Sequence, residues 1–235
     1  MPRQTHLADR SALARRLAAE GLGAFFLFAT VIGSGIMAEN LSRGNEAIAL
    51  LANTLATGAM LFVLITMMGP ISGAHMNPAV SLVAAARREL SWKEAGAYAI
   101  AQIGFGIVGA WAAHLMFDLP ALQLSVKVRT GLGQWTGEAI ATFGLILTII
   151  GTTRHRPAWV PASVALYIVA AYWFTSSTSF ANPAITIARS LSDSFAGIAP
   201  ADVPLFIVAQ LLGAGLAALT ARFLFDADPA PVTAQ

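Results

Sequence analysis

"ISGAHMNPAVSL" (residues 71–82) and "SFANPAITIARS" (residues 179–190) share the tripeptide Asn-Pro-Ala, about a hundred residues apart. Asn is a favoured N-cap and Pro suits the first turn of a helix, so each tripeptide predicts the start of a helix. The helical patterns that follow, 77–86 and 182–191, are each only ten residues long. Because a helix needs ~20 residues to cross a bilayer, these two segments are predicted to be half-helices that cannot span it.

The composition of the chain is that of a membrane protein. Of its 235 residues, 57% are hydrophobic and 11% are charged, whereas a soluble domain carries roughly 25% charged residues. Its long apolar runs lack the two-residue alternation of barrel strands. They cover residues 17–38, 47–69, 95–117, 134–152, 158–176 and 204–225. We therefore expect an all-α membrane protein with six transmembrane helices and two re-entrant half-helices.

The basic residues predict the orientation of the chain. If the N-terminus is cytoplasmic, the inner segments hold Arg3, Arg10, Arg15, Arg16, Arg87, Arg88, Lys93, Arg154, Arg156 and Arg222, and the outer segments hold Arg43, Lys127, Arg129 and Arg189. This excess agrees with the positive-inside rule. The tails, 1–16 and 226–235, are then both cytoplasmic. The net charge of +2 gives no indication of a nucleic-acid partner, and the chain has no Cys for a thiolate metal site.

The chain contains an internal repeat. The segment EGLGAFFLFATVIG (20–33) aligns with EAIATFGLILTIIG (138–151), and the pair Ala-Gln opens both the third and the sixth apolar run, at 101–102 and 209–210. Each half, about 17–117 and 134–225, holds three crossings, so the second half runs opposite to the first. An inverted repeat places its working site near the membrane midplane, where the halves meet. We expect residues 1–235 to form one channel domain.

These features resemble the aquaporin (major intrinsic protein) family over residues 17–225. The resemblance rests on SGAHMNPAV, the second Asn-Pro-Ala, Glu20 and Glu138, and the Ala-Gln openings. It implies a passive channel that is not an enzyme and has no cofactor, one pore in each subunit of a homotetramer, in a bacterial inner membrane. Its implied partners are the lipid bilayer, water and small neutral solutes.

The resemblance also assigns roles to individual residues. The pore motifs are Asn77, Pro78, Ala79, Asn182, Pro183 and Ala184. The backbone carbonyls implied to line the pore belong to Gly73, Ala74, His75, Thr178, Ser179 and Phe180. The family usually has glycines before the second motif, and this chain does not. Glu20 and Glu138 are implied to support the two loops.

The chain departs from the family at the narrowest ring of the pore. The family's filter Arg lies three residues after the second Asn, where this chain has Ile185. The other ring positions fall on Thr57, Ser179 and either Ala170, in an ungapped alignment, or Ile168. A ring with no charge, aromatic residue or His predicts a wide, neutral filter that passes water and small solutes such as glycerol-like polyols. The resemblance to family members that lack this Arg further implies metalloid hydroxides such as arsenite. The alternatives are a water-selective aquaporin and an ion-coupled secondary transporter.

Arg189 lies four residues beyond Ile185, hence about one turn further along the half-helix and ~40° around it. It lines the outer vestibule and attracts oxyanions, or it is solvated or paired with Asp193 at (i, i+4). We favour solvation or the pair. In each case, Arg189 is predicted to lie too far out to act as the filter residue.

Overall fold

The computed structural model describes the backbone of residues 2–225 and the side chains of residues 12–225. Its helices are α1 (Pro2–Ser42), α2 (Glu46–Ser72), α3 (Pro78–Ala86), α4 (Trp92–Met116), α5 (Leu132–His155), α6 (Val160–Phe174), α7 (Pro183–Ser190) and α8 (Val203–Phe225). The 3-10 turns η1 (Pro157–Trp159) and η2 (Pro200–Asp202) lead into α6 and α8. The predicted tail 226–235 lies outside the described residues.

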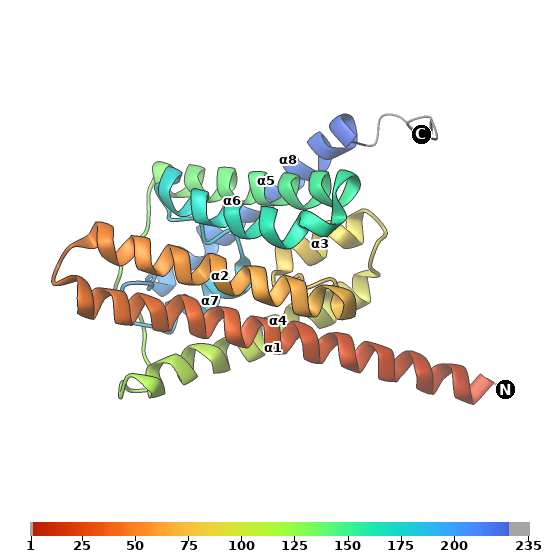
Figure 1. The fold of residues 1–235 in the computed structure, drawn as a ribbon, viewed down its shortest axis with the longest axis horizontal. Helices are drawn as coiled ribbons and strands as arrows, with labels where there is room; N and C mark the ends of the chain where they lie inside the picture. The colour runs from red at the N-terminus through yellow and green to blue at the C-terminus, as the bar shows by residue number, and fades with distance from the viewer. Residues whose placement is uncertain (1, 226–235) are drawn as a thin grey trace.

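The prediction of six membrane-spanning helices is confirmed. Within the described residues, six helical segments are long and apolar enough to cross a membrane: Ala12–Ser42, Glu46–Ser72, Trp92–Met116, Leu132–His155, Pro157–Phe174 and Pro200–Phe225. Each corresponds to one predicted apolar run. The start of α1 and the end of α8 lie at the same end of the bundle (Figure 1), as an even number of crossings requires.

The two short helices begin at the Asn-Pro-Ala motifs. Asn77 and Asn182 are the N-caps of α3 and α7, with extended backbones at φ −155° and −158°. The side-chain Oδ1 of each accepts a hydrogen bond from the backbone N–H two residues on, at 2.9 Å from Ala79 and 2.9 Å from Ala184. The motif therefore caps and starts each half-helix through local chemistry alone.

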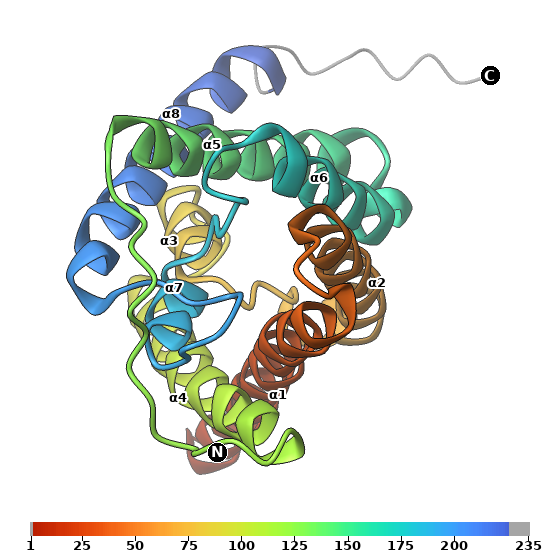
Figure 2. The same cartoon turned by 90° about the vertical axis from the view of Figure 1, so that its left-hand side faces the viewer.

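The packing of the helices repeats in the two halves. Helix α1 packs against α2 and α4, and α5 packs in the same way against α6 and α8. The half-helices cross between the halves, because α3 contacts both α4 and α8, and α7 contacts both α8 and α4. Figure 2 shows α3 and α7 inside the ring of long helices, with α2 and α6 meeting at its edge. This is the arrangement of an inverted 3+3 repeat.

Glycines allow the closest helix crossings. A Cβ on Gly109 of α4 would lie 2.3 Å from the carbonyl oxygen of Phe25, and one on Gly213 of α8 would lie 2.1 Å from that of Ala139. Both positions serve the same crossing in the two halves. Gly215, by contrast, has no neighbouring atom within 4 Å of such a Cβ. The small residues therefore act at specific positions, as expected for close helix packing in membranes.

Candidate functional site

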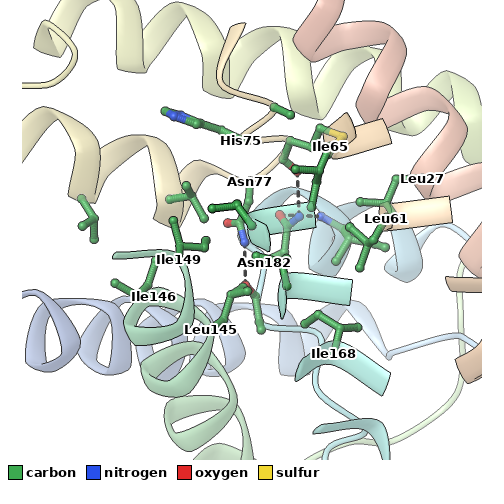
Figure 3. Close-up of a pocket in the computed structure, with 18 of the residues that line it drawn as sticks. Leu27, Leu61, Ile65, His75, Asn77, Leu145, Ile146, Ile149, Ile168 and Asn182 are labelled. Atoms are coloured by element: carbon green, nitrogen blue, oxygen red, sulfur yellow. Dashed lines mark hydrogen bonds between the residues drawn. The ribbon is translucent and has the colours of Figure 1, made fainter. Parts of the chain in front are cut away.

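The N-termini of α3 and α7 meet through their capping residues. Asn77 Nδ2 donates to the carbonyl oxygen of Ala181 at 2.7 Å, and Asn182 Nδ2 donates to that of Met76 at 2.8 Å (Figure 3). An amide group carries two N–H donors, so each Asn retains one beyond this bond. Both residues line the central cavity. Two helix N-termini, each with roughly +0.5 charge, therefore converge there.

The loop before α3 is held by the buried carboxylate of Glu20 on α1. Glu20 Oε1 accepts from the backbone N–H of His75 at 2.9 Å, and Oε2 accepts from that of Met76 at 2.6 Å. Two side chains also donate to it: Ser72 Oγ at 2.6 Å and Gln102 Nε2 at 2.7 Å. Glu20 is fully buried, and its hydrogen-bonding capacity is directed at the loop and its neighbours.

Glu138 on α5 holds the loop before α7 in the same way. Its Oε1 accepts from the backbone N–H of Phe180 at 2.8 Å, and its Oε2 accepts from that of Ala181 at 2.9 Å and from Gln210 Nε2 at 2.6 Å. Gln210 Nε2 also donates to Thr186 Oγ1 at 2.9 Å. In the first half, Gln102 makes the equivalent second bond, to Ser81. The repeated Ala-Gln pair was the sequence signal for these two glutamines, although the pairs lie inside α4 and α8 and do not open them as expected.

The two loops share a backbone conformation although their sequences differ. In these two loops, the residues with φ between 47° and 89° are Gly73, Ala74, Met76, Thr178, Ser179 and Ala181. Such left-handed residues turn successive N–H groups toward one point, which creates a concavity that binds an anion. The carboxylates of Glu20 and Glu138 occupy these concavities. Thr178, which is β-branched, stands in the second loop where the first has Gly73, and left-handed backbone is strained for such a residue.

A cavity of about 290 Å³ runs along the junction, far above the ~10–15 Å³ that one water needs. One wall is apolar and comes from α1, α2, α5 and α6. It includes Leu27, Leu61, Ile65, Leu145, Ile146, Ile149, Val164 and Ile168 (Figure 3). The opposite wall is the polar backbone of the two loops, residues 73–77 and 179–182. Of the predicted carbonyl residues, Thr178 is not part of this wall, whereas Met76 and Ala181, which were not predicted, are.

The predicted ring residues fall partly in the cavity. Thr57, Ser179 and Ile185 line it. Ala170 does not, because its side chain is exposed on the outside of α6, and this expectation is corrected. The alternative, Ile168, is buried and lines the cavity. Residues two positions apart on a helix point in directions that differ by ~200°, so only one of Ile168 and Ala170 can point into the cavity.

The favoured expectations for Arg189, solvation or a pair with Asp193, are wrong. Its side chain is 2% exposed, so it is not solvated. It makes no ion pair with Asp193, whose carboxylate instead accepts from the backbone N–H of Val126 at 3.2 Å. Arg189 lies over the ring of Phe180, with 3.3 Å from Cζ to the ring centre, and lines the cavity with Ile185. The cavity near Ile185 therefore has a charge and, in Tyr172 and Phe180, aromatic side chains, which the sequence reasoning missed.

Comparison with known proteins agrees with this geometry. Residues 8–175 match the model of the family described as "Major intrinsic protein". The chain is 55% identical over 214 residues to the aquaglyceroporin AqpS of Rhizobium meliloti (strain 1021), covering 91% of each chain. It is 29% identical over 240 residues to aquaporin Z of Bradyrhizobium diazoefficiens, covering 94% of this chain and 97% of that one. It shares its fold with the aquaglyceroporin from Plasmodium falciparum at TM-score 0.72 and 20% identity, over 90% and 96% of the two chains.

Proposed function

Because the chain belongs to the major intrinsic protein family, we propose that it is a passive membrane channel for water and small neutral solutes of the glycerol type. The observation that carries this proposal is the cavity with one apolar wall, one wall of loop backbone, and Asn77 and Asn182 at its middle. Residues 1–235 act as one channel domain that transports without catalysis.

The physics of the junction supports neutral permeation. A solute oxygen accepts from the free amide hydrogens of Asn77 and Asn182, and loop carbonyls accept the hydroxyl hydrogens of the solute. The two helix dipoles oppose the entry of a cation. The apolar wall receives the carbon skeleton of a polyol. We assign the pore to the two Asn-Pro-Ala motifs and the filter to Thr57, Ile168, Ser179 and Ile185, with Glu20 and Glu138 as supports.

The relative named an aquaglyceroporin supports a solute range wider than water. The apolar side chains of Ile168 and Ile185 in the cavity point the same way. Undissociated arsenite and related metalloid hydroxides are small, neutral and polyhydroxylated, so we include them in the proposed range.

The carboxylates argue against an ion-coupled carrier. Such a transporter needs an acid or carbonyl site that takes and releases an ion at the midplane. Glu20 and Glu138 are both fully buried, and both oxygens of each accept hydrogen bonds from the loops or from Gln side chains. The hydrogen bonds that both carboxylates accept support a structural role and not the binding and release of an ion.

We further propose a homotetramer in a bacterial inner membrane with both termini cytoplasmic. The exposed faces of the long helices carry large apolar side chains, such as Leu55, Ile100 and Leu212, which suit lipid or neighbouring subunits. The distribution of Lys and Arg supports the orientation.

The test is stopped-flow light scattering of proteoliposomes that contain the purified protein. We expect osmotic water flux with a low activation energy, and re-swelling that rises linearly with the gradient of glycerol, urea or arsenite. Flux that saturates with solute concentration would indicate a carrier. Vesicles that behave like protein-free liposomes would reject the channel altogether.

A further inference from the structure

Two buried arginines lie against the ring of Phe180. The Cζ of Arg189, on α7, lies 3.3 Å from the ring centre, and that of Arg129, in the loop between α4 and α5, lies 5.0 Å from it. Their exposed fractions are 2% and 8%. Guanidinium groups stack favourably on aromatic faces, and this fixes their position.

Backbone carbonyls hold both guanidinium groups in place. Arg189 Nε donates to the carbonyl oxygen of Ala196. Arg129 Nε donates to that of Gly197 at 2.8 Å, and its Nη1 donates to that of Ser177 at 3.2 Å. Neither forms an ion pair, since the ion pairs among the described residues are Arg16–Glu94 and Arg87–Glu89. Two positive charges are thus fixed at this end of the pore without a carboxylate partner, an arrangement that marks function in a membrane protein.

The two arginines differ in what they face. Arg189 lines the cavity, and Arg129 is not among the residues that do. Within the described part of the chain, the Nε bond is the only hydrogen bond of the Arg189 side chain. Its two terminal amino groups are therefore available to a molecule in the cavity. Arg129, whose Cζ is 5.0 Å from the centre of the Phe180 ring, contributes its charge without lining the cavity.

Helix geometry explains how Arg189 reaches the pore from a turn away. Ile185 and Arg189 are four residues apart, so their Cα atoms differ by ~6 Å along α7. The Cα–Cβ bonds of a helix tilt toward its N-terminus, and long side chains cover the preceding turn. The N-terminus of α7 lies at the pore junction. The side chain of Arg189 therefore returns the guanidinium toward the level of Ile185.

We propose that Arg189 is the specificity-determining cation of this pore. It lies one turn beyond Ile185 on α7 and supplies the positive charge that the uncharged Ile185 cannot supply. This inference rests on the proposed channel function. Three hydroxyl groups line the same cavity as Arg189. The Tyr172 hydroxyl donates a hydrogen bond to that of Thr57 at 3.3 Å, and the Ser179 hydroxyl has no hydrogen-bond partner. Ile168 and Ile185 add the apolar contacts.

This arrangement predicts two properties of the pore. The guanidinium repels cations, and its two amino groups donate to solute oxygens, so neutral molecules with hydroxyl or carbonyl oxygens are favoured. Lys127 adds a third positive charge nearby, where its Nζ donates to the carbonyl oxygen of Phe195 at 2.8 Å. Burial, followed by the charges of Arg129 and Arg189, lowers the pKa of Lys127 below its ordinary value. The positive field at this end of the pore therefore extends beyond one residue.

The experiment compares Arg189→Met with Arg129→Met in proteoliposomes. Met has similar length and no charge, and both variants lose a buried guanidinium that stacks on Phe180. The readouts are the rate at which an imposed pH gradient collapses, the uptake of methylammonium, and the rank order of glycerol, urea and arsenite flux. For Arg189→Met, we expect the cation leak to rise about tenfold or more, as removal of one close unit charge implies, with a changed rank order. Arg129→Met should keep the wild-type rank order.

Arg189→Lys provides a second variant should Arg189→Met fail to fold. Lysine keeps the charge but loses the planar, two-pronged donor, so cation exclusion should persist while the rank order changes. The proposal is overturned if Arg189→Met matches Arg129→Met in both leak and rank order, or, when only the lysine variant folds, if its rank order is that of the wild type. Failure of the channel proposal is separate, because the wild-type protein would then give no flux above protein-free vesicles.

Discussion

Asn77 and Asn182 each donate a hydrogen bond to the backbone carbonyl directly before the other, at 2.7 Å to Ala181 and 2.8 Å to Met76. Each side chain also caps its own half-helix through Oδ1. The distance between the two helix N-termini is therefore set by a reciprocal pair of bonds. The positive field at the middle of the cavity depends on both halves at once.

Replacing Asn182 with Asp should reduce solute flux and admit cations. A carboxylate still caps α7, but it cannot donate to Met76, and its charge cancels the positive field of the junction. Stopped-flow flux and the decay of a potassium gradient in proteoliposomes measure both effects. Asn53→Asp is the control, because Asn53 is buried, donates to the carbonyl oxygen of Val31, and is not among the residues that line the cavity. Wild-type solute flux without a cation leak in Asn182→Asp would contradict the placement of the second motif.

Glu138→Gln should lower the stability of the folded protein and leave its selectivity among solutes unchanged. The amide oxygen still accepts one loop N–H, but the new NH₂ group faces the donors of Ala181 and Gln210. Each buried donor left without an acceptor costs about 1–3 kcal/mol. Thermal unfolding in detergent and the yield of purified protein should both fall. In the control Glu94→Gln, the residue is partly exposed at the start of α4, where it pairs with Arg16 and caps the helix, and the loss should be smaller. Normal stability with lost transport would instead favour a coupled carrier.

Gly213→Ala should destabilise the protein far more than Gly215→Ala. The new methyl of the first would lie 2.1 Å from the carbonyl oxygen of Ala139, so α5 and α8 must separate, whereas the second meets nothing within 4 Å. Overpacking of this kind costs typically 1–3 kcal/mol. Melting temperatures in detergent provide the comparison. Equal melting temperatures for the two variants would show that the α5–α8 crossing is looser than the structure describes.

Ile185→Arg in the Arg189→Met background should restore the exclusion of cations. The double variant moves the guanidinium to the preceding turn, so the pH-gradient collapse should slow toward the wild-type rate. Glycerol and arsenite flux should fall further than water flux, because the new side chain also fills space that Ile185 leaves open. A leak that persists in the double variant would show that a positive charge at this end of the cavity does not control cation entry.

The sequence predicted the elements of the fold because their signals are local or periodic. Asn followed by Pro starts a helix wherever it stands, and six long apolar runs admit few alternatives in a membrane. Glu20 and Glu138 stood out because charges at that depth are expensive. The roles given to these residues stay predictions that the experiments above test.

The details of the cavity could not be predicted in the same way. Helix α6 is apolar all round, so polarity could not decide whether Ile168 or Ala170 points inward. The position of Arg189 was inferred from the spacing of Cα atoms, which ignores the backward tilt of helical side chains. Its stacking partner, Phe180, belongs to a loop whose conformation depends on Glu138, a residue 42 positions away.

The bond from Asn77 to Ala181 also bears on how the protein is made. Its donor and acceptor are separated by 104 residues, which a ribosome adding ~5–20 residues per second needs roughly 5–20 s to synthesise. Only the first two crossings, α1 and α2, precede Asn77 in the chain, so its amide lacks this acceptor while α3 to α6 are synthesised. The reciprocal pair of bonds that joins the two halves can therefore form only after residue 182 has been added to the chain.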